Sequence, residues 1–324
     1  MSNLDNIFFF KKIVDLRYPQ EEGITVVIEE VVNEVREMLS KLSDEDFSEV
    51  ITCCFIPDLY SGMGKREKLF TKLTELMVGE WWRRMGGSFN LPKKKSGTED
   101  VELLYGSISI VCDAKVFRLG RSQTAPNVKD FLKLQSVREW IDNRNTYYKE
   151  RQETRKVIGG LVTYSSLHEW EKDSEVYSEC TNYETPVVML PYEVLALLLK
   201  YKSRIKLYDL AALWDYQKNN VIKTKEKRLY WDYVNGFICR LLNITKEQYE
   251  DEINSYRKEI VSAVAYYRAI VQAVIDETRD NLRTKFSKFT SLEELIEHAI
   301  QEIEERDNAV ALDYLKRIDE FRVY

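Results

Sequence analysis

Residues that form turns are scarce in this chain, and this scarcity restricts its fold more than any other feature. The 324 residues include 12 Gly and 6 Pro, well below the share of about 12% that the two make up in average globular proteins. Long helices with few turns are therefore favoured. Because 44% of the residues are hydrophobic, the chain can bury a large core, which excludes intrinsic disorder, collagen-like repeats and small disulfide-stapled scaffolds.

The sequence favours a cytoplasmic protein without membrane segments. No apolar run approaches the roughly 18 residues of a membrane helix, and an early Phe triplet is followed at once by Lys11 and Lys12, the wrong order for a signal peptide. The 5 Cys form no CxxC pair, which indicates reduced, buried thiols. His168 and His298 are the only histidines, so a mechanism of metal and carboxylates is favoured over one that needs a histidine base.

The hydrophobic periodicity predicts an α/β architecture. Apolar residues at helical spacing predict helices over 26–42, over 65–85 and from Pro191 to about residue 200. β-branched runs predict the strands 101–104, 107–117, 157–163 and 187–190. The first two strands are joined by Tyr105-Gly106, so we expect them to form a hairpin.

The C-terminal region changes to a purely helical pattern. Thr245 and Gln248 have the spacing of a capping box, and apolar residues then recur every three or four positions as far as residue 274. Ser291 and Glu294 repeat the capping signal before a final acidic helix. We expect these helices to pack on the core or against a second subunit.

The charge of the chain is unevenly distributed. The net charge is −6, which by itself argues against a nucleic-acid partner. Residues 65–156, however, contain 20 basic and 12 acidic side chains, a balance of +8, so the remainder carries −14. Such a segment is either a solvated face or a phosphate-binding surface. The motifs inside the segment are needed to choose between these two interpretations.

The basic segment contains Asp113-Ala114-Lys115, the only [DE]-x-K triplet in the chain. Side chains alternate along a strand, so Asp113 and Lys115 share one face, and closing the hairpin brings Asp100 beside Asp113. Two carboxylates and the Ala114 carbonyl suit Mg²⁺, while Lys115 is placed to orient or deprotonate a water. The pattern is the signature of the PD-(D/E)xK nucleases, and a structural ion pair is the alternative on equal footing.

A longer run extends this signal to a family. Residues 113–121 (DAKVFRLGR), followed by Lys129-Asp130-Phe131, resemble the catalytic region of the HindIII type II restriction endonucleases. The resemblance continues in Glu67-Lys68-Leu69-Phe70, in 194–199 and in Leu213-Trp214, and it covers about half of the chain. The loop between Arg121 and Lys129 is two residues longer than in the family pattern.

The resemblance implies a single nuclease domain over 1–324 with a PD-(D/E)xK core, a central mixed sheet flanked by helices. Its expected parts are a helical N-terminal part (1–60), a catalytic α/β core (65–216) and a helical C-terminal part (245–324). It further implies a homodimer that takes part in restriction–modification. The enzyme would make Mg²⁺-dependent double-strand cuts at a palindrome, AAGCTT, after the first adenine, and leave 5′ overhangs.

The family pattern also implies roles for single residues. Asp113 and Lys115 are the expected catalytic pair, Asp130 is a further important acid, and Glu67 is a helix acid that supports the site. The loop after the catalytic strand offers side chains that read bases, and Lys93 to Lys95 are expected on phosphates. The other residues expected to contact DNA are Arg118, Arg121, Ser122, Gln123, Thr124, Ala125, Asn127, Lys129, Asp130 and Lys133.

Two other functions stay open at this stage. One is a nucleic-acid-binding protein that does not cut, in which Asp113 and Lys115 only form a salt bridge. The other is a PD-(D/E)xK nuclease that acts on repair intermediates rather than at one sequence.

Overall fold

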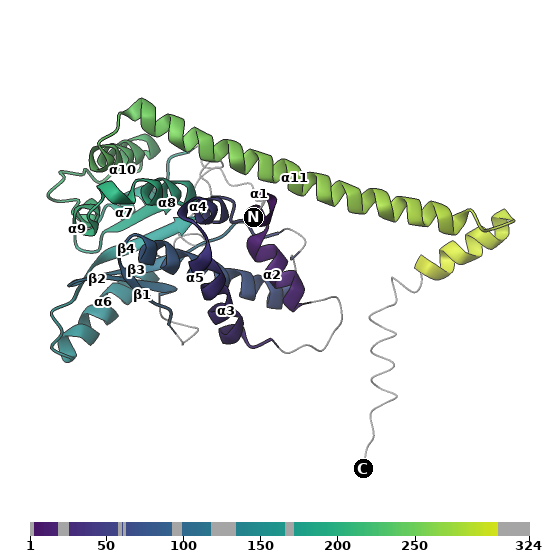
Figure 1. Ribbon diagram of the computed structural model, residues 1–324, viewed down its shortest axis with the longest axis horizontal. Helices are drawn as coiled ribbons and strands as arrows, with labels where there is room; N and C mark the ends of the chain where they lie inside the picture. Colours follow the sequence, from purple (N-terminus) through teal and green to yellow (C-terminus); the bar gives the residue numbers. More distant parts are fainter. Residues whose placement is uncertain are drawn as a thin grey trace, which may run out of the picture. The chain divides into compact units, whose positions relative to one another are not determined.

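The computed structural model describes residues 3–18, 26–57, 60, 63–92, 99–117, 134–165 and 172–303. The chain divides into two compact units, Met1–Val264 and Ala265–Tyr324. The first unit contains the sheet and its covering helices (Figure 1). The second contains the end of the longest helix and a further helical segment, 292–303, called the acidic helix below.

A five-stranded mixed sheet forms the centre of the first unit. Its strands are β1 (Ser88–Asn90), β2 (Val101–Tyr105), β3 (Ile108–Ala114), β4 (Lys156–Tyr164) and β5 (Val187–Pro191), in spatial order β1-β2-β3-β4-β5. The pairs β1–β2 and β2–β3 are antiparallel, whereas β3–β4 and β4–β5 are parallel. The strands from β3 to β5 therefore end at one common edge of the sheet.

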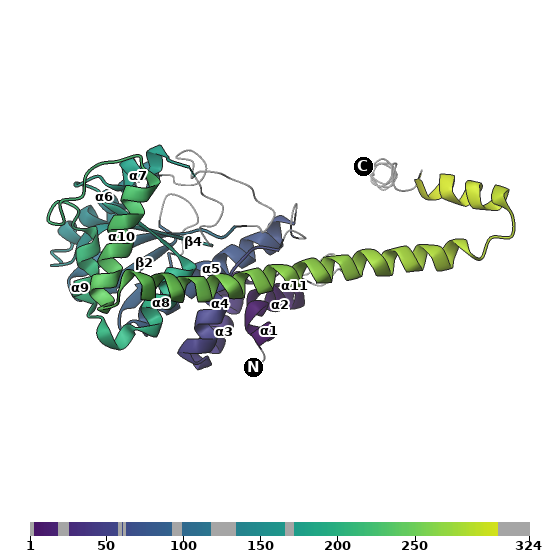
Figure 2. The same ribbon diagram turned by 90° about the horizontal axis from the view of Figure 1, so that it is seen from above.

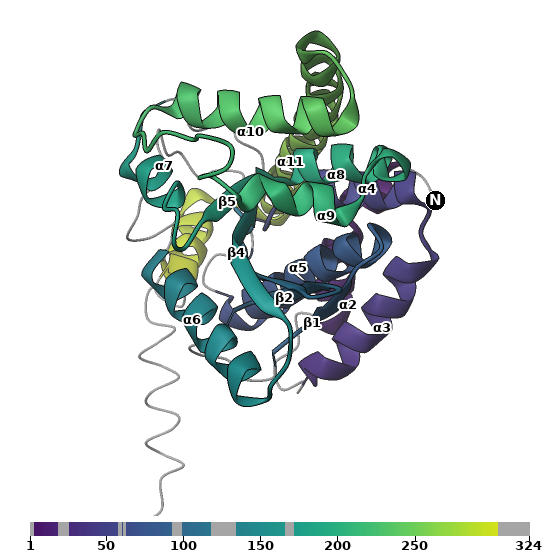
Figure 3. The ribbon, with the colours of Figure 1, turned by 90° about the vertical axis from the view of Figure 1, so that its left-hand side faces the viewer.

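The helices are α1 (Asn3–Ile7), α2 (Phe9–Arg17), α3 (Ile28–Lys41), α4 (Asp44–Thr52), α5 (Gly64–Arg84), α6 (Leu134–Glu150), α7 (Glu175–Cys180), α8 (Tyr192–Lys200), α9 (Leu207–Ala211), α10 (Lys227–Leu242) and α11 (Lys246–Phe286), with 3₁₀ turns at Lys202–Arg204 and Ala212–Trp214. Figure 3 shows α5 and α6 on opposite sides of the sheet. The indole N–H of Trp81 in α5 donates to the carbonyl of Leu195 in α8 (2.9 Å), which joins α5 and α8 in one layer.

The predicted fold class, α/β with a mixed sheet and flanking helices, is confirmed. The predicted hairpin is β2–β3, and the predicted strands 157–163 and 187–190 are β4 and β5. One boundary was wrong: β3 ends at Ala114, not at Phe117. The carbonyl of Phe117 accepts from the N–H of Ile56 (2.9 Å), so the chain has left the sheet by that point and pairs with the segment after α4.

The capping signals have the expected geometry. The Ser43 side chain accepts from the N–H of Asp46 at the start of α4 (3.0 Å). Thr245 and Gln248 form the reciprocal capping box of α11, with distances of 2.9 and 3.2 Å. Figure 2 shows the first turns of α11 lying beside α4 and α8. The expectation that this helix packs on the core therefore holds for its first part, in which Ile253 and Ile260 are buried.

The five cysteines are free thiols, and four of them are buried, while Cys239 is partly exposed. Burial raises the pKa of the Cys54 thiol to about 12, so this side chain is an inert core residue. Among the helices in the described ranges, none is both long enough and apolar enough to cross a membrane.

Candidate active site

The candidate site lies where β3, β4 and β5 end. Ala114 pairs with Thr163, and Thr163 pairs with Leu190, so residues at the ends of three parallel strands form one row across the sheet. In open α/β sheets, functional groups collect at the carboxyl ends of parallel strands because the following loops start there. Asp113 precedes this row, and Lys115 follows it.

Asp113 and Lys115 face the same way, as the alternation along the strand predicts. Lys115 Nζ lies 2.6 Å from Asp113 Oδ1, and the Asp113 side chain is 2% exposed whereas that of Lys115 is 29% exposed. A surface ion pair would be open to water on both sides. Here the Asp113 carboxylate is buried and the Lys115 side chain is partly exposed to solvent, so the pair combines a desolvated anion with an accessible cation.

Asp100 lies beside this pair, at the start of β2. Its Oδ2 accepts from the backbone N–H of Ala114 (3.0 Å), and its own N–H donates to the carbonyl of Cys112 (3.1 Å). Burial, together with the negative charges of Asp113 and Glu75, raises the pKa of Asp100 to about 8. Asp100 and Asp113 are therefore close enough to repel each other when both are ionised.

A third carboxylate, Glu75, belongs to the same cluster, and sequence reasoning missed it. Glu75 is in the middle of α5, 6% exposed, and its carboxylate contacts Lys72 one turn earlier. Burial, with a smaller contribution from the charge of Asp113, raises the pKa of Glu75 to about 7. The signal available in the sequence was an acid at an otherwise apolar position of the α5 stripe, three residues after a lysine.

The backbone of Lys115 is fixed from two sides. Its N–H donates to the carbonyl of Thr163 on β4 (2.7 Å), and its carbonyl accepts from the hydroxyl of Tyr192 (2.6 Å). Two residues later, the N–H of Phe117 donates to Ser165 Oγ (3.1 Å). These bonds hold the end of the catalytic strand in place although it has left the regular sheet.

The carboxylates of the site are hard oxygen ligands that could hold a divalent metal ion. Both oxygens of Asp113 are buried; Oδ1 is paired with the Lys115 ammonium, and within the described residues Oδ2 accepts no hydrogen bond of good geometry. A buried carboxylate oxygen in that state is costly unless a cation completes it. No group of three or more His, Cys, Asp or Glu side chains in the described ranges is arranged to enclose a metal. Mg²⁺ needs only one or two carboxylates because water and phosphate oxygens complete its octahedron.

A second buried acidic cluster on β2 provides a contrast. Glu102, 1% exposed, accepts from Ser109 (2.9 Å) and Asn90 (3.1 Å) and contacts the hydroxyl of Tyr148. Arg144 from α6 pairs with Glu99 and lies 3.8 Å from Glu102. Both oxygens of Glu102 have hydrogen-bond donors, as structural carboxylates do. Asp113 has the Lys115 ammonium at Oδ1 but, within the described residues, no hydrogen bond of good geometry at Oδ2, and this difference separates the two clusters.

The other residues proposed from the sequence fall into two groups. Glu67 is in the first turn of α5, two turns before Glu75. The following lie outside the described residues: Lys93, Lys94, Lys95, Arg118, Arg121, Ser122, Gln123, Thr124, Ala125, Asn127, Lys129, Asp130, Lys133 and His168. His298 is in the acidic helix, where its ring centroid lies 4.9 Å from that of Phe289.

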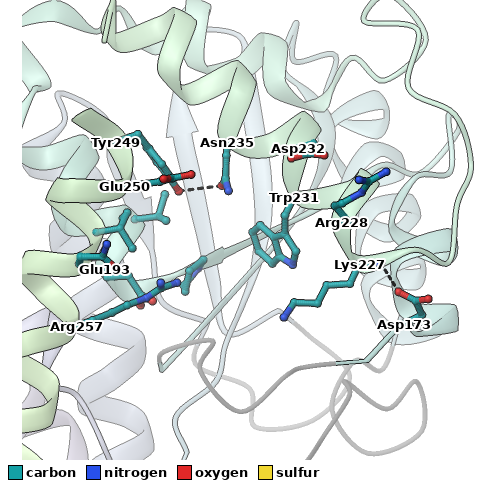
Figure 4. Close-up of a pocket in the computed structure, with 14 residues that line it drawn as sticks. Asp173, Glu193, Lys227, Arg228, Trp231, Asp232, Asn235, Tyr249, Glu250 and Arg257 are labelled. Carbon is teal, nitrogen blue, oxygen red and sulfur yellow. Dashed lines mark hydrogen bonds between the residues drawn. The ribbon is translucent and has the colours of Figure 1, made fainter. Parts of the chain in front are cut away.

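A separate pocket of about 730 Å³ lies between α10, the start of α11 and the junction of β5 with α8 (Figure 4). None of the residues proposed for catalysis lines it. Three basic side chains, those of Lys227, Arg228 and Arg257, share it with four acidic ones, those of Asp173, Glu193, Asp232 and Glu250. Because acidic side chains outnumber basic ones, this pocket is not suited to binding phosphate.

Comparisons with known proteins bear on the family of the chain. The model of the HindIII restriction endonuclease family matches residues 24–310. No curated protein matches the chain. Among solved structures, the chain is similar to the small subunit (R.BspD6I2) of the heterodimeric restriction endonuclease R.BspD6I, with 15% identity over 62% of this chain and 96% of that one. The TM-score of 0.26 is too low for that structure to support an argument.

Proposed function

Since this chain belongs to the HindIII restriction endonuclease family and is a site-specific nuclease, we propose that it makes Mg²⁺-dependent double-strand cuts at a short palindrome. The proposed target is AAGCTT, cut after the first adenine to leave 5′ overhangs, as the resemblance in the catalytic run implies. The proposed setting is a cytoplasmic restriction–modification system. The observation that carries the chemistry is the buried Asp113, incompletely satisfied, with Asp100 and Lys115 beside it.

The proposed catalytic core lies within 65–216, and its residues have different proposed roles. Asp100 and Asp113, with the carbonyl of Ala114, would hold the ion, which when bound supplies charge neutralisation on the phosphate and a more acidic water. Lys115 orients the attacking water through its ammonium group, the more exposed member of the pair, or, in its neutral form, helps to take a proton from that water. As the water oxygen bonds to phosphorus, the bond to the leaving oxygen breaks.

The remaining proposed residues support this core. Glu75 and Glu67, both on α5, add negative charge on the helix that packs against β2 and β3. We propose Asp130 as a further acid of the site, and the loop from Ser122 to Lys133 as the part that reads bases. Phosphate contacts by Arg118, Arg121 and Lys93 to Lys95 would set the register without reading sequence.

A homodimer on double-stranded DNA is the proposed assembly. One active site per chain cuts one strand, so two chains related by a two-fold axis present identical side chains to the two halves of a palindrome. A protein with two copies of the site therefore makes a double-strand cut without turning over on the DNA.

Plasmid digestion tests the proposal. The purified protein with Mg²⁺ should give discrete fragments, and sequencing their ends should return one palindrome with one cut position and overhang. Asp113→Asn and Lys115→Ala should abolish cleavage and leave specific DNA binding largely intact, because both residues serve chemistry rather than base reading. Near wild-type cutting by either variant would overturn the site assignment.

The same experiment separates the two other functions. Retained binding with no fragments at any Mg²⁺ concentration would favour a DNA-binding protein that does not cut. Cleavage confined to branched, gapped or flapped substrates would favour a repair nuclease. Discrete fragments whose ends all share one sequence would exclude both of these functions.

A further inference from the structure

The second compact unit contains long helices but no core in the residues that the structure describes. Over 265–303, none of the described side chains is buried. The end of α11 and the acidic helix account for nearly all of this stretch. The acidic helix is short enough to be marginal in water by itself, and most helical stability in proteins comes from packing an apolar face. The exposed apolar side chains of the unit are therefore candidates for a contact with a partner.

The end of α11 presents one such surface, called the α11 stripe below. Val271, Ile275 and Leu282 are 38%, 46% and 42% exposed, at spacings of four and seven residues. Residues at these spacings lie on one side of a helix. The stripe continues the spacing by which Ile253 and Ile260 pack on the core of the first unit, but its own members remain exposed.

The acidic helix has two different sides. One side contacts the end of α11: the His298 ring lies 6.3 Å from that of Phe286, and Lys285 pairs with Glu302. The other side is apolar and exposed, and its members are Leu292 (69%), Ile296 (48%), Ile300 (45%) and Ile303 (49%). The contact with its own α11 thus leaves the apolar side of the acidic helix uncovered.

Charge decides which surfaces fit together. The acidic helix has four Glu and no Lys or Arg over 292–303, a balance of −4. The part of α11 in the second unit, 265–286, has four basic and three acidic side chains, a balance of +1. Two acidic helices packed on each other would place like charges side by side. An acidic helix packed on α11 places opposite charges along the rim of an apolar contact.

We propose that a second copy of this chain covers both surfaces, with the acidic helix of each copy packed on the α11 stripe of the other. This inference rests on the homodimer of the proposed function and assigns its interface. Two-fold exchange of this kind forms two identical contacts, and every exposed apolar residue named above is then shielded from water. The second copy is the one partner whose charges are known to be complementary, since the chain itself supplies both helices.

Sedimentation velocity of the full-length protein over a concentration series tests the interface. Wild-type protein should be dimeric. The double variant Ile296→Glu, Ile300→Glu should raise the dimer dissociation constant by about 100-fold or more, because each contact would bury two unpaired carboxylates. The control Ile222→Glu changes an even more exposed isoleucine (78%) of the first unit and should leave the dissociation constant unchanged. A double variant that dimerises as tightly as the wild type would overturn the interface.

Charge reversal tests which helix meets which. Glu293→Lys with Glu297→Lys should weaken the dimer, and adding Arg268→Glu with Arg279→Glu should restore it. A contact between two acidic helices would instead tighten when Glu293→Lys and Glu297→Lys bring the balance of the helix from −4 to 0, which would overturn the proposed pairing. Hydrogen exchange supplies a second readout: amides in 265–303 should lose protection whenever the dimer is lost.

Plasmid cleavage keeps this inference separate from the nuclease proposal. The double variant retains the Asp113 site, so it should still nick one strand while double-strand cutting falls at low enzyme concentration. A wild-type protein that dimerises through these helices but never cuts defeats the nuclease proposal alone. A protein that cuts, and whose dimer is unaffected by the substitutions, defeats the interface alone.

Discussion

The hydroxyl of Tyr192, the first residue of α8, donates a hydrogen bond of 2.6 Å to the carbonyl oxygen of Lys115. Tyr192 is fully buried, and burial raises its pKa well above the ordinary value of 10.0. The hydroxyl therefore keeps its proton at any working pH and always acts as the donor. The bond ties the residue after the catalytic strand to the helix that follows β5.

Tyr192→Phe removes this donor and leaves the Lys115 carbonyl without its partner. The expected losses are about 1 kcal/mol in the free energy of unfolding and a lower kcat with little change in KM, because Lys115 loses its fixed position but DNA contacts remain. Urea titration and steady-state cleavage measure the two effects. Tyr183→Phe is the control, since Tyr183 makes an equally short bond to the Val221 carbonyl (2.6 Å) and should leave kcat unchanged.

Glu75→Gln should shift the pH dependence of cleavage. The Glu75 charge raises the pKa of Asp100, so removing it lowers that pKa and lets Asp100 ionise at lower pH. The acidic limb of the kcat/KM profile should move to lower pH. Glu67→Gln is the matched substitution on the same helix. Glu67 is two turns away from Glu75 along α5, so this substitution should move the profile less, and a shift as large as that of Glu75→Gln would contradict the difference between the two acids.

The metal-free protein should become less stable between about pH 4 and pH 8. Asp100 and Glu75 lose their protons near pH 4 when unfolded, but their folded pKa values are about 8 and about 7. The folded state binds more protons across this window, so the free energy of unfolding falls as the pH rises. Asp100→Asn should reduce the slope and stabilise the metal-free protein at pH 8 by at least about 1 kcal/mol.

Mg²⁺ should reverse that trend. Its ligands must be deprotonated, so its affinity rises with pH towards about 8, and binding releases protons. The increase in Tm on adding Mg²⁺ should therefore be larger at pH 8 than at pH 6. An increase that does not depend on pH would mean that the ion binds away from Asp100 and Asp113.

The part of the site that the sequence predicted is the part that is local in the chain. Asp113 and Lys115 are two residues apart, and Asp100 reaches them through a hairpin with a two-residue turn, so strand alternation and antiparallel pairing suffice. The places of Glu75 and Tyr192 in the site could not be predicted from such local patterns. Their positions depend on how α5 docks on the sheet and on the parallel register of β4 with β5, which no local pattern determines.

The same distinction applies to the fold. Helix α5 was predictable because its apolar stripe is regular and long, and α11 because its capping box marks the start. Helix α6 has only Leu134, Val137, Ile141 and Tyr148 buried, a sparse pattern between charged residues. Strand β1 has three residues with no buried side chain among them, so it exists only because β2 offers an edge to pair with.

Asn127→Ala tests the proposed reading loop. Asn can donate to and accept from adenine in the major groove, and a good bidentate contact contributes about 1–3 kcal/mol of discrimination. We expect the variant to lose that amount in the ratio of kcat/KM between the cognate site and sites with one adenine replaced. Asp113→Asn is the opposite case, because it should lose cleavage and keep binding selectivity. Equal weakening of Asn127→Ala on every sequence would make the residue a phosphate contact and place base reading elsewhere in the loop.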